Sequence, residues 1–492
     1  MRQNHYFYKG KTLVLAALAA CALGITSCDD VYDDDETWRS DVTNTTLTSP
    51  DVSKIIVTPS TDGSKMTITW PVVHGAEGYE VTLLDITDVT APVPVDSINA
   101  KKVDGCEITA SRTEDTNYSV AVRALGSAKF NNQDADSASV KTFTTAQPAF
   151  GTIPDGADLT QWFAENAIPA DSVGMLLCYD LQPGGNYTMS GDIDFYNHRV
   201  ALRTLSKTNH AKITLTGNAR LRTSAGLEMK NLSFNCSASE DPLIELSETP
   251  DEAIKGATGN GDYYNIMSPI TLNSCIIDSV NNNLVYDSNK KYCVGTMLIT
   301  NCIVHLTSSS ATNINGNAVI YFKAGYVNDL TIQSSTFYNT GDSDAKYFVQ
   351  YNNSGRCDRG GYTSNSISYK NCTFYNVAKK GQWGNYNGFA GRPTSQWTMT
   401  NNIFVDCGNK QIARRFLGGR GNQSTATFAN NTYMIDGEFE SKDGSVESYD
   451  KSGTAIEQDP GFVNPSEGDF TVTGSAQLDK KTGDPRWLPA SE

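Results

Sequence analysis

Histidine, basic charge and known catalytic motifs are all scarce in this 492-residue sequence. None of its five histidines lies in an H-E-x-x-H motif or beside a nucleophile motif, which argues against histidine-based catalysis. The mature chain also lacks a G-x-x-x-x-G-K-[ST] loop, which argues against nucleotide chemistry. Acidic residues number 55 and basic residues 39, so nucleic acid is not an expected partner.

Long apolar runs are also missing, apart from one near the start of the chain. Residues 13–25 follow two lysines and are long enough for the core of a signal peptide but too short to span a bilayer. The segment Ile25-Thr26-Ser27-Cys28 resembles the lipobox of bacterial lipoproteins. This resemblance implies that residues 1–27 are a signal peptide and that Cys28 becomes a lipidated membrane anchor.

The chain after Cys28 is strongly acidic, because six of the eight residues 29–36 are Asp or Glu. We expect residues 28–51 to form a disordered, solvated tether. The acidic run resembles the export signal of Bacteroidota lipoproteins, which implies a place on the outer face of the outer membrane. Removal of residues 1–27 leaves 36 basic and 55 acidic residues. An acidic polymer would therefore bind only where basic residues gather locally.

Cysteine occurs without the spacing that metal or redox sites need. The chain has 11 cysteines and no C-x-x-C pair. Nine of them follow Cys28, so at least one is unpaired within the chain. We expect these cysteines to pack as small apolar residues.

One short pattern recurs seven times between residues 226 and 435. Two alternating apolar residues precede a turn position, and two more alternating apolar residues follow it. The turn positions are Asn231, Ser274, Asn301, Ser334, Asn371, Asn401 and Asn430. Their spacing of 27 to 43 residues is typical of solenoids.

Alternation with period two predicts two short strands that meet at a corner in each repeat. Asparagine tolerates positive φ, so we expect that conformation at the turn and a ladder of hydrogen bonds between stacked asparagines. Similar residues recur after the turn and predict internal stacks: Cys275, Cys302 and Cys372 one position later, and Phe234, Phe337, Phe374 and Phe404 three positions later.

The corner asparagines and the N-C-T-F and N-N-I-F steps at 371–374 and 401–404 resemble the right-handed parallel β-helix of pectate-lyase-like proteins. The resemblance covers roughly residues 150–480. It includes an opening coil at 181–193 and a closing segment, DPGFVNPSEGDF, at 459–470. It implies an all-β fold with a single-stranded right-handed parallel β-helix over residues 158–492.

A different pattern occupies residues 52–146, where four alternating runs separated by turn residues predict an antiparallel sandwich. Trp70 in an early strand and Tyr118 at the start of a later one resemble a fibronectin type III domain. We interpret this domain as a spacer and residues 147–157 as a linker. Residues 158–167 are predicted to form a helix, with Asp158 as its N-cap, that covers the open end of the solenoid.

The strand before each repeat is the predicted wall of a binding groove. Five segments align there: LVYDS (284–288), VIYFK (319–323), FVQYN (348–352), GFAGR (388–392) and RFLGG (415–419). The columns expected to face solvent, and a nearby arginine, give the predicted binding residues Tyr286, Tyr321, Lys323, Gln350, Arg392 and Arg415. Aromatic faces suit a pyranose ring and basic groups suit carboxylates. The alternative is that these are ordinary outward strand residues.

Two chemistries remain open for such a groove. A lyase acting on uronic-acid polymers needs a basic residue, and Arg392 is the candidate because its G-R-P sequence resembles the arginine-proline element of the lyases. Calcium would need several carboxylates, and Asp192 and Asp194 are the nearest pair to such a cluster. No cofactor is otherwise expected.

The predicted protein is an outer-surface lipoprotein that captures an extracellular, acidic, pectin-like polysaccharide. It resembles accessory lipoproteins of polysaccharide-utilisation systems, which implies partnership with other glycan-utilisation proteins at the cell surface. The alternatives are a polysaccharide lyase working by β-elimination and a structural or adhesive surface protein.

Overall fold

The computed structural model describes residues 42–61, 63–256, 261–307, 318–341, 345–353, 362–390, 392–418, 425–440 and 445–490. The protein is all-β and divides into two compact units, one built from the strands up to Thr144 and the other beginning at Thr145. Cys28 and the acidic run 29–36 lie outside the described residues. Within the described ranges, no helix is long and apolar enough to cross a membrane.

Two antiparallel sheets enclose the apolar core of the N-terminal unit. One has the order β1-β2-β6 and the other β4-β3-β7-β8, with β5 beside β3. Their bounds are β1 Ile56–Pro59, β2 Lys65–Thr69, β3 Ala76–Asp85, β4 Val93–Pro94, β5 Lys101–Val103, β6 Glu107–Ser111, β7 Asn117–Gly126 and β8 Ser139–Thr144. The four predicted strands correspond to β2, β3, β7 and β8, which confirms the antiparallel arrangement expected from their alternation.

The predicted disordered tether is wrong for residues 42–51. Thr46 forms a β-bridge with Gln133, and Leu47 is 6% exposed within the core of the N-terminal unit. An apolar side chain gains free energy by filling that core, which outweighs the ordering of a short segment.

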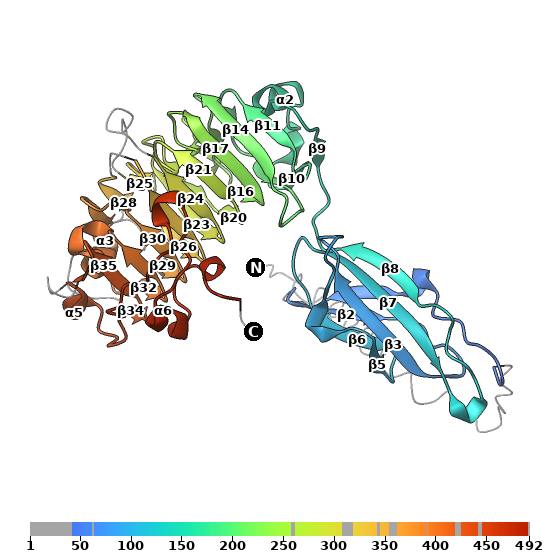
Figure 1. Ribbon diagram of the computed structural model, residues 1–492. Coiled ribbons are helices and arrows are strands. Elements are labelled where there is room, and N and C mark those ends of the chain that lie inside the picture. The colour runs from blue at the N-terminus through green and yellow to red at the C-terminus, as the bar shows by residue number, and fades with distance from the viewer. Residues whose placement is uncertain are drawn as a thin grey trace, which may run out of the picture. The chain divides into compact units, whose positions relative to one another are not determined.

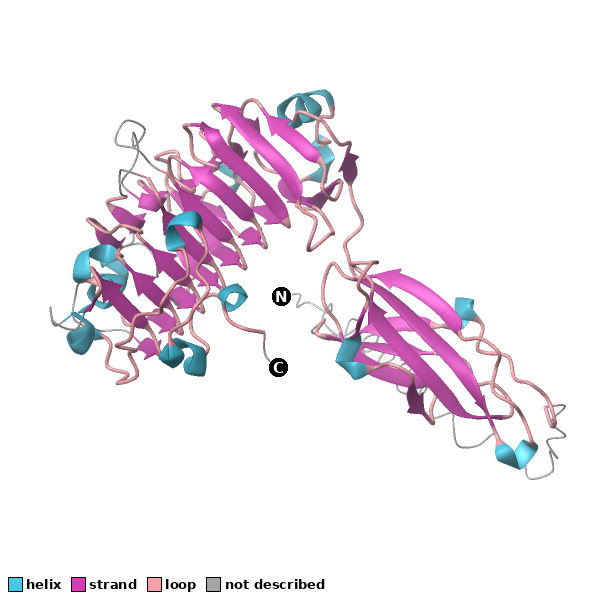
Figure 2. Ribbon diagram, viewed as in Figure 1, coloured by secondary structure: helices cyan, strands magenta, loops and turns pink. Residues whose placement is uncertain are grey.

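Three sheets of parallel strands stack coil upon coil to form the solenoid (Figures 1 and 2). Sheet one contains β9 Gly151–Ile153, β10 Leu176–Leu181, β13 Arg199–Arg203, β16 Leu227–Lys230, β19 Tyr264–Ile266, β20 Ile270–Asn273, β23 Tyr292–Thr300, β26 Tyr326–Gln333, β29 Asn365–Lys370, β32 Ser395–Thr400 and β34 Thr425–Ala429. Strand β9 lies within residues 147–157, which were predicted to be a linker. It instead pairs with β10 and so belongs to the solenoid.

The other two sheets complete each coil. Sheet two contains β11 Asn186–Met189, β14 Ala211–Gly217, β17 Leu232–Ser239, β21 Ile276–Val280, β24 Ile303–Leu306, β27 Thr336–Asn339, β30 Thr373–Tyr375, β33 Ile403–Val405, β35 Thr432–Ile435 and the antiparallel β36 Glu438–Phe439. Sheet three contains β12 Ile193–Asp194, β15 Leu221–Thr223, β18 Ile244–Leu246, β22 Val285–Tyr286, β25 Ala318–Phe322, β28 Tyr347–Tyr351 and β31 Gln382–Asn385.

The corner between sheets one and two carries the repeat's turn position. All seven predicted turn residues have positive φ, between 48° and 57°. Asn430 Nδ2 donates to Asn401 Oδ1 at 3.0 Å, which confirms one rung of the expected asparagine ladder. At Ser274 the turn residue is serine instead of asparagine. Its hydroxyl takes the place of the asparagine acceptor, and Asn301 Nδ2 donates to Ser274 Oγ at 3.0 Å.

Aromatic rings stack inside the solenoid as the repeat predicts. Phe374 lies parallel to Phe404 with ring centroids 5.0 Å apart, and Phe337 stacks on its other side at 5.7 Å. Tyr433 extends the column at 5.7 Å from Phe404. The eight described cysteines are free thiols, and Cys275, Cys302 and Cys372 are fully buried, so packing is their role as expected.

The two ends of the solenoid are closed differently. Helix α2, Leu159–Glu165, contacts β11 and β12 and buries Leu159 in the core, while Asp158 caps it by accepting the N–H of Gln161 at 3.0 Å. The other end carries α3 Asn387–Ala390, α4 Ile412–Phe416, α5 Ser445–Tyr449 and α6 Ser475–Lys480.

After α6 the chain runs back along sheet two (Figure 1). Gly483 N–H donates to Asn401 O at 2.8 Å, and Asp484 N–H donates to Thr373 Oγ1 at 3.0 Å. Arg486 then reaches an earlier coil, where its Nη2 donates to Asn301 Oδ1 at 2.7 Å. The predicted closing segment thus leads into a clasp, residues 483–487, that crosses several coils.

Candidate functional site

The predicted binding face is the outer side of sheet three. Strand pairing places Tyr286, Tyr321 and Gln350 in one column, and Asn385 of β31 continues it. The residues that precede the first three members, Val285, Ile320 and Val349, lie in the main core. The register expected for the first three segments is therefore confirmed.

The tyrosines in this column do not form an open platform, and the expectation that they face solvent is wrong. Tyr286 is 9% exposed and Tyr321 is 4% exposed, and their rings stack with centroids 5.6 Å apart. Ala318 and Tyr347 join them in a small apolar cluster separate from the main core. Gln350 is 8% exposed. Aromatic rings gain more by packing on each other than by remaining in water, so the column is covered.

The last two aligned segments are wrong in structure. The described residues of the fourth segment, 388–390 and 392, fall on and after α3, and residues 415–418 fall at the end of α4, so neither segment continues the strand column. Phe389 and Phe416 do point into the core, as the alignment requires. A phenylalanine on a helical turn can fill the core as well as one on a strand. The apolar pattern therefore predicted strands where the structure has helices. Arg392 and Arg415 are therefore not stacked above Lys323.

An ion-pair network occupies the outer face of the first coils of sheet three. Asp192 bonds to Arg220 Nε at 2.8 Å and to Arg222 Nε at 3.0 Å, while Glu245 lies 2.8 Å from Arg220 Nη1. Asp194 instead accepts the hydroxyl of Ser247 at 2.6 Å. The calcium candidates Asp192 and Asp194 thus have separate partners, and the described part of the chain holds no group of three or more His, Cys, Asp or Glu side chains placed to bind a metal.

Asp287 fixes the turn that carries the exposed Lys323. Its carboxylate is fully buried and accepts the N–H groups of Ala324 and Gly325 at 2.8 Å each. Burial raises the pKa of Asp287 to about 6, although these N–H groups act in the opposite direction. Gly325 is required here because a Cβ would lie 2.1 Å from Tyr292 O.

This raised pKa predicts a pH dependence of stability. The unfolded chain releases the Asp287 proton near pH 4, whereas the folded protein keeps it until about pH 6, so this contribution is complete below pH 4 and lost as the pH rises through 6. We expect the loss to be roughly 2 kcal/mol and absent in Asp287→Asn. Urea unfolding of both proteins between pH 4 and 7 measures the difference, and parallel profiles would contradict it.

Unpaired positive charge gathers beyond β31, where α4 packs in place of another strand. Arg414 Nη1 and Arg415 Nε each lie 3.4 Å from Gln411 Oε1, and Arg414 Nε is buried with no acceptor in the described part of the chain. Neither arginine has a carboxylate within 4 Å among the described residues. Lys346 Nζ lies 5.6 Å from the ring of Tyr347.

The charges of neighbouring groups affect the pKa of Arg415. Burial lowers the pKa of Arg415, the adjacent Arg414 lowers it further, and Tyr347 and Tyr449 act in the opposite direction. Two partly buried guanidinium groups side by side repel each other unless an anion lies between them. We call Lys346, Tyr347, Arg414 and Arg415 the arginine site. The nearby carboxylate of Glu440 is already bound to the N–H of Ile412 at 3.1 Å.

A carboxylate–imidazole–hydroxyl chain lies on sheet two. His305 Nδ1 is 2.7 Å from Asp278 Oδ1, and its Nε2 is 2.7 Å from Thr340 Oγ1. Such chains activate nucleophiles in hydrolases, but acyl transfer also needs N–H donors for the oxyanion. The N–H groups of Thr340 and Gly341 already donate within the protein, at 3.0 and 2.9 Å. We therefore interpret this chain as a surface hydrogen-bond network.

The fold places the protein in the class of all-β chains with a parallel β-solenoid. Three family models, each of a domain of unknown function, match parts of it: DUF4992 over residues 1–176, DUF4957 over 185–340 and DUF5123 over 367–487. Strands pair across the boundary between the last two, β26 with β29 and β27 with β30, so these matches are parts of one solenoid. No curated protein matches the chain.

Sequence reasoning named Arg415 as a binding residue but missed Lys346 and Tyr347 of the arginine site. Arg414 is adjacent in sequence, and two consecutive arginines after the apolar pair Ile412 and Ala413 are a signal for cations at the edge of a core. Lys346 and Tyr347 carry no such signal, because only the stacking of β28 and β31 brings them towards α4.

Proposed function

We propose that the protein binds an anionic, pectin-like polysaccharide at the outer cell surface, with the arginine site meeting its carboxylates. The observation that carries this proposal is the pair Arg414 and Arg415, partly buried and without a carboxylate partner among the described residues, in a chain of net charge −16. Arginine binds carboxylates in two-pronged fashion, because its planar guanidinium presents two parallel N–H donors. Lys323 is exposed just after β25 of sheet three and is a further cation on the solenoid.

Affinity electrophoresis tests this proposal. Polygalacturonate in a native gel should retard the wild-type protein, and Arg414→Ala/Arg415→Ala should weaken the interaction at least about tenfold, because each charged hydrogen bond contributes roughly 1.5–3 kcal/mol. A neutral glucan should retard neither protein.

The matched control is Lys54→Ala/Lys65→Ala, which removes the same charge from exposed positions of the N-terminal unit. Equal losses of retardation in both double variants would show that net charge alone causes the effect, and would contradict the proposed site. Absence of retardation in any acidic polymer would favour the structural or adhesive role.

The second candidate function is β-elimination on a uronic-acid polymer. The lowered pKa of Arg415 favours it, because a lyase base must lose its proton, and it makes Arg415 a better candidate for the base than Arg392. New ultraviolet absorbance from unsaturated uronates, abolished in Arg415→Lys, would support cleavage. A steady absorbance across pectins and glycosaminoglycans, with and without calcium, would leave capture alone.

The remaining parts of the proposal concern architecture. We infer a right-handed, pectate-lyase-like β-helix from the repeat, and a fibronectin type III spacer from Trp70 and Tyr118. In support of the spacer, Tyr118 Oη accepts the N–H of Thr113 at 2.9 Å, as in a tyrosine corner. The lipid anchor at Cys28 and the outer-surface location rest on the sequence motifs alone. Mass spectrometry of the mature protein would detect or disprove the lipid.

A further inference from the structure

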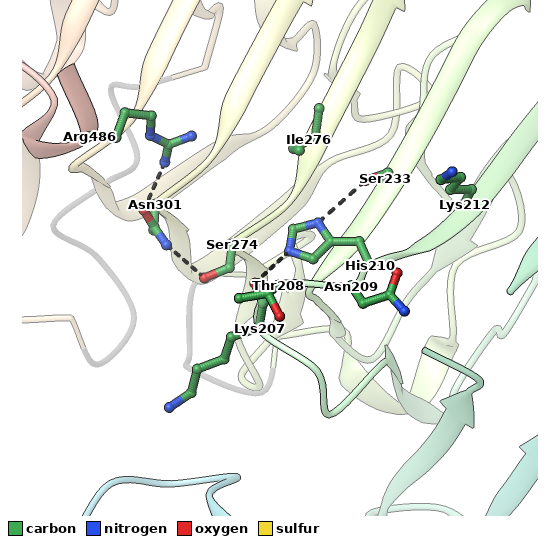
Figure 3. Close-up of a pocket in the computed structure, with 10 residues that line it drawn as sticks. All are labelled: Lys207, Thr208, Asn209, His210, Lys212, Ser233, Ser274, Ile276, Asn301 and Arg486. Carbon is green, nitrogen blue, oxygen red and sulfur yellow. Dashed lines mark hydrogen bonds between the residues drawn. The ribbon is translucent and has the colours of Figure 1, made fainter. Parts of the chain in front are cut away.

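A hollow of about 490 Å³ lies on the solenoid at the start of sheet two (Figure 3), and none of its lining residues belongs to the arginine site. Lys207 and His210 come from the turn before β14, and Lys212 lies on β14 itself. Arg486 enters from the clasp. The hollow thus joins residues from the two regions matched by separate family models.

Strand register and hydrogen bonds fix these side chains. Lys212 pairs with Ser233 of the next coil, so both lie in one column on the outer face. Arg486 Nη2 donates to Asn301 Oδ1 at 2.7 Å. His210 Nδ1 lies 3.4 Å from Ser233 Oγ, which turns its ring into the hollow (Figure 3).

The charge of the hollow opposes that of the protein. Three of its lining residues, Lys207, Lys212 and Arg486, are cationic and none is acidic, whereas the chain carries a net charge of −16. Asp484 pairs with Arg486 Nε at 3.0 Å, but it is 1% exposed and does not line the hollow. Burial lowers the pKa of His210, and Arg486 lowers it further, as expected in a positive field. A recess lined by one sign of charge concentrates ions of the other sign.

We propose that this hollow is a second anion-binding site, which takes a uronate or sulfated unit of an acidic glycan. Its volume lies in the range of small-molecule sites. Lysine ammonium groups and one guanidinium suit carboxylate or sulfate oxygens, while the hydroxyl of Ser233 and the apolar Ile276 suit a sugar ring. The ligand class rests on the proposed function, but the site is separate.

Short ligands are used so that each site is titrated by its own bound molecule. Isothermal titration of the full mature chain with trigalacturonate tests carboxylates, and titration with a sulfated heparin disaccharide tests sulfates. We expect Lys207→Ala/Lys212→Ala to weaken binding in the hollow at least about tenfold and to remove one site from the stoichiometry. Lys212→Glu should do the same, and Lys54→Ala/Lys65→Ala should not.

The possible results distinguish failure of the hollow from failure of the arginine site. Loss of a site only in Arg414→Ala/Arg415→Ala would overturn the hollow and leave the proposed function standing. Loss only in Lys207→Ala/Lys212→Ala would support the hollow and overturn the arginine site. No binding of either ligand overturns both. Thermal unfolding of each variant checks that the solenoid remains folded, and Arg486 is left intact because its removal would strand the buried Asp484.

Discussion

Replacing Phe374 by alanine is expected to lower the free energy of unfolding of the solenoid by about 3–5 kcal/mol. Phe374 is fully buried between Phe337 and Phe404, and its ring also meets Trp383 edge-on at 4.9 Å. Alanine leaves a cavity in the middle of a continuous column. The neighbouring rings cannot close it, because each is held at its own height by paired strands.

Urea denaturation followed by circular dichroism measures this loss. Phe150→Ala is the control, because Phe150 is 46% exposed, and we expect it to change stability by less than about 1 kcal/mol. Similar midpoints for Phe374→Ala and wild type would show that the column does not stabilise the solenoid.

Replacing Asp484 by alanine is expected to cost about 3 kcal/mol and to release the clasp. The buried Asp484 carboxylate accepts the hydroxyl of Thr336 at 2.7 Å and the guanidinium of Arg486 at 3.0 Å. Alanine removes both bonds and leaves the arginine without its counter-charge. The indole N–H of Trp487 donates to the hydroxyl of Thr336 at 2.7 Å, so the loss of Asp484 would also change the hydrogen bonding around Trp487.

Hydrogen exchange distinguishes local release from global unfolding. Residues 483–487 should exchange faster in Asp484→Ala, while strands of the first coils keep their protection. Asp484→Asn is the conservative control because it retains one acceptor, and it should lose less. Unchanged exchange in the clasp of Asp484→Ala would contradict its anchoring role.

The repeat was predictable because its causes are local. A positive φ at Asn231 or Asn401 and the alternation around it depend on neighbours in the same strand pair, and both were found at the expected positions. The column from Tyr286 to Gln350 was predictable for the same reason.

The site was less predictable because its causes are not local. The clustering of Tyr321 with Tyr286 and Tyr347, and the packing of α4 on β31, join residues far apart in the chain. The hollow is the extreme case, since Arg486 contacts Asn301 across 185 positions. A pattern read along one strand has no access to such contacts.

The clasp changes how this protein comes apart and how it is completed. In a simple stack each layer touches only the next, so unravelling can begin at a frayed terminus and advance layer by layer. Here the clasp binds coils formed much earlier in the chain, which joins distant coils into one cooperative block. Since residues 483–487 are synthesised after the coils that they bind, the block locks only once those coils have been made, and a chain without the clasp residues would lose that lock.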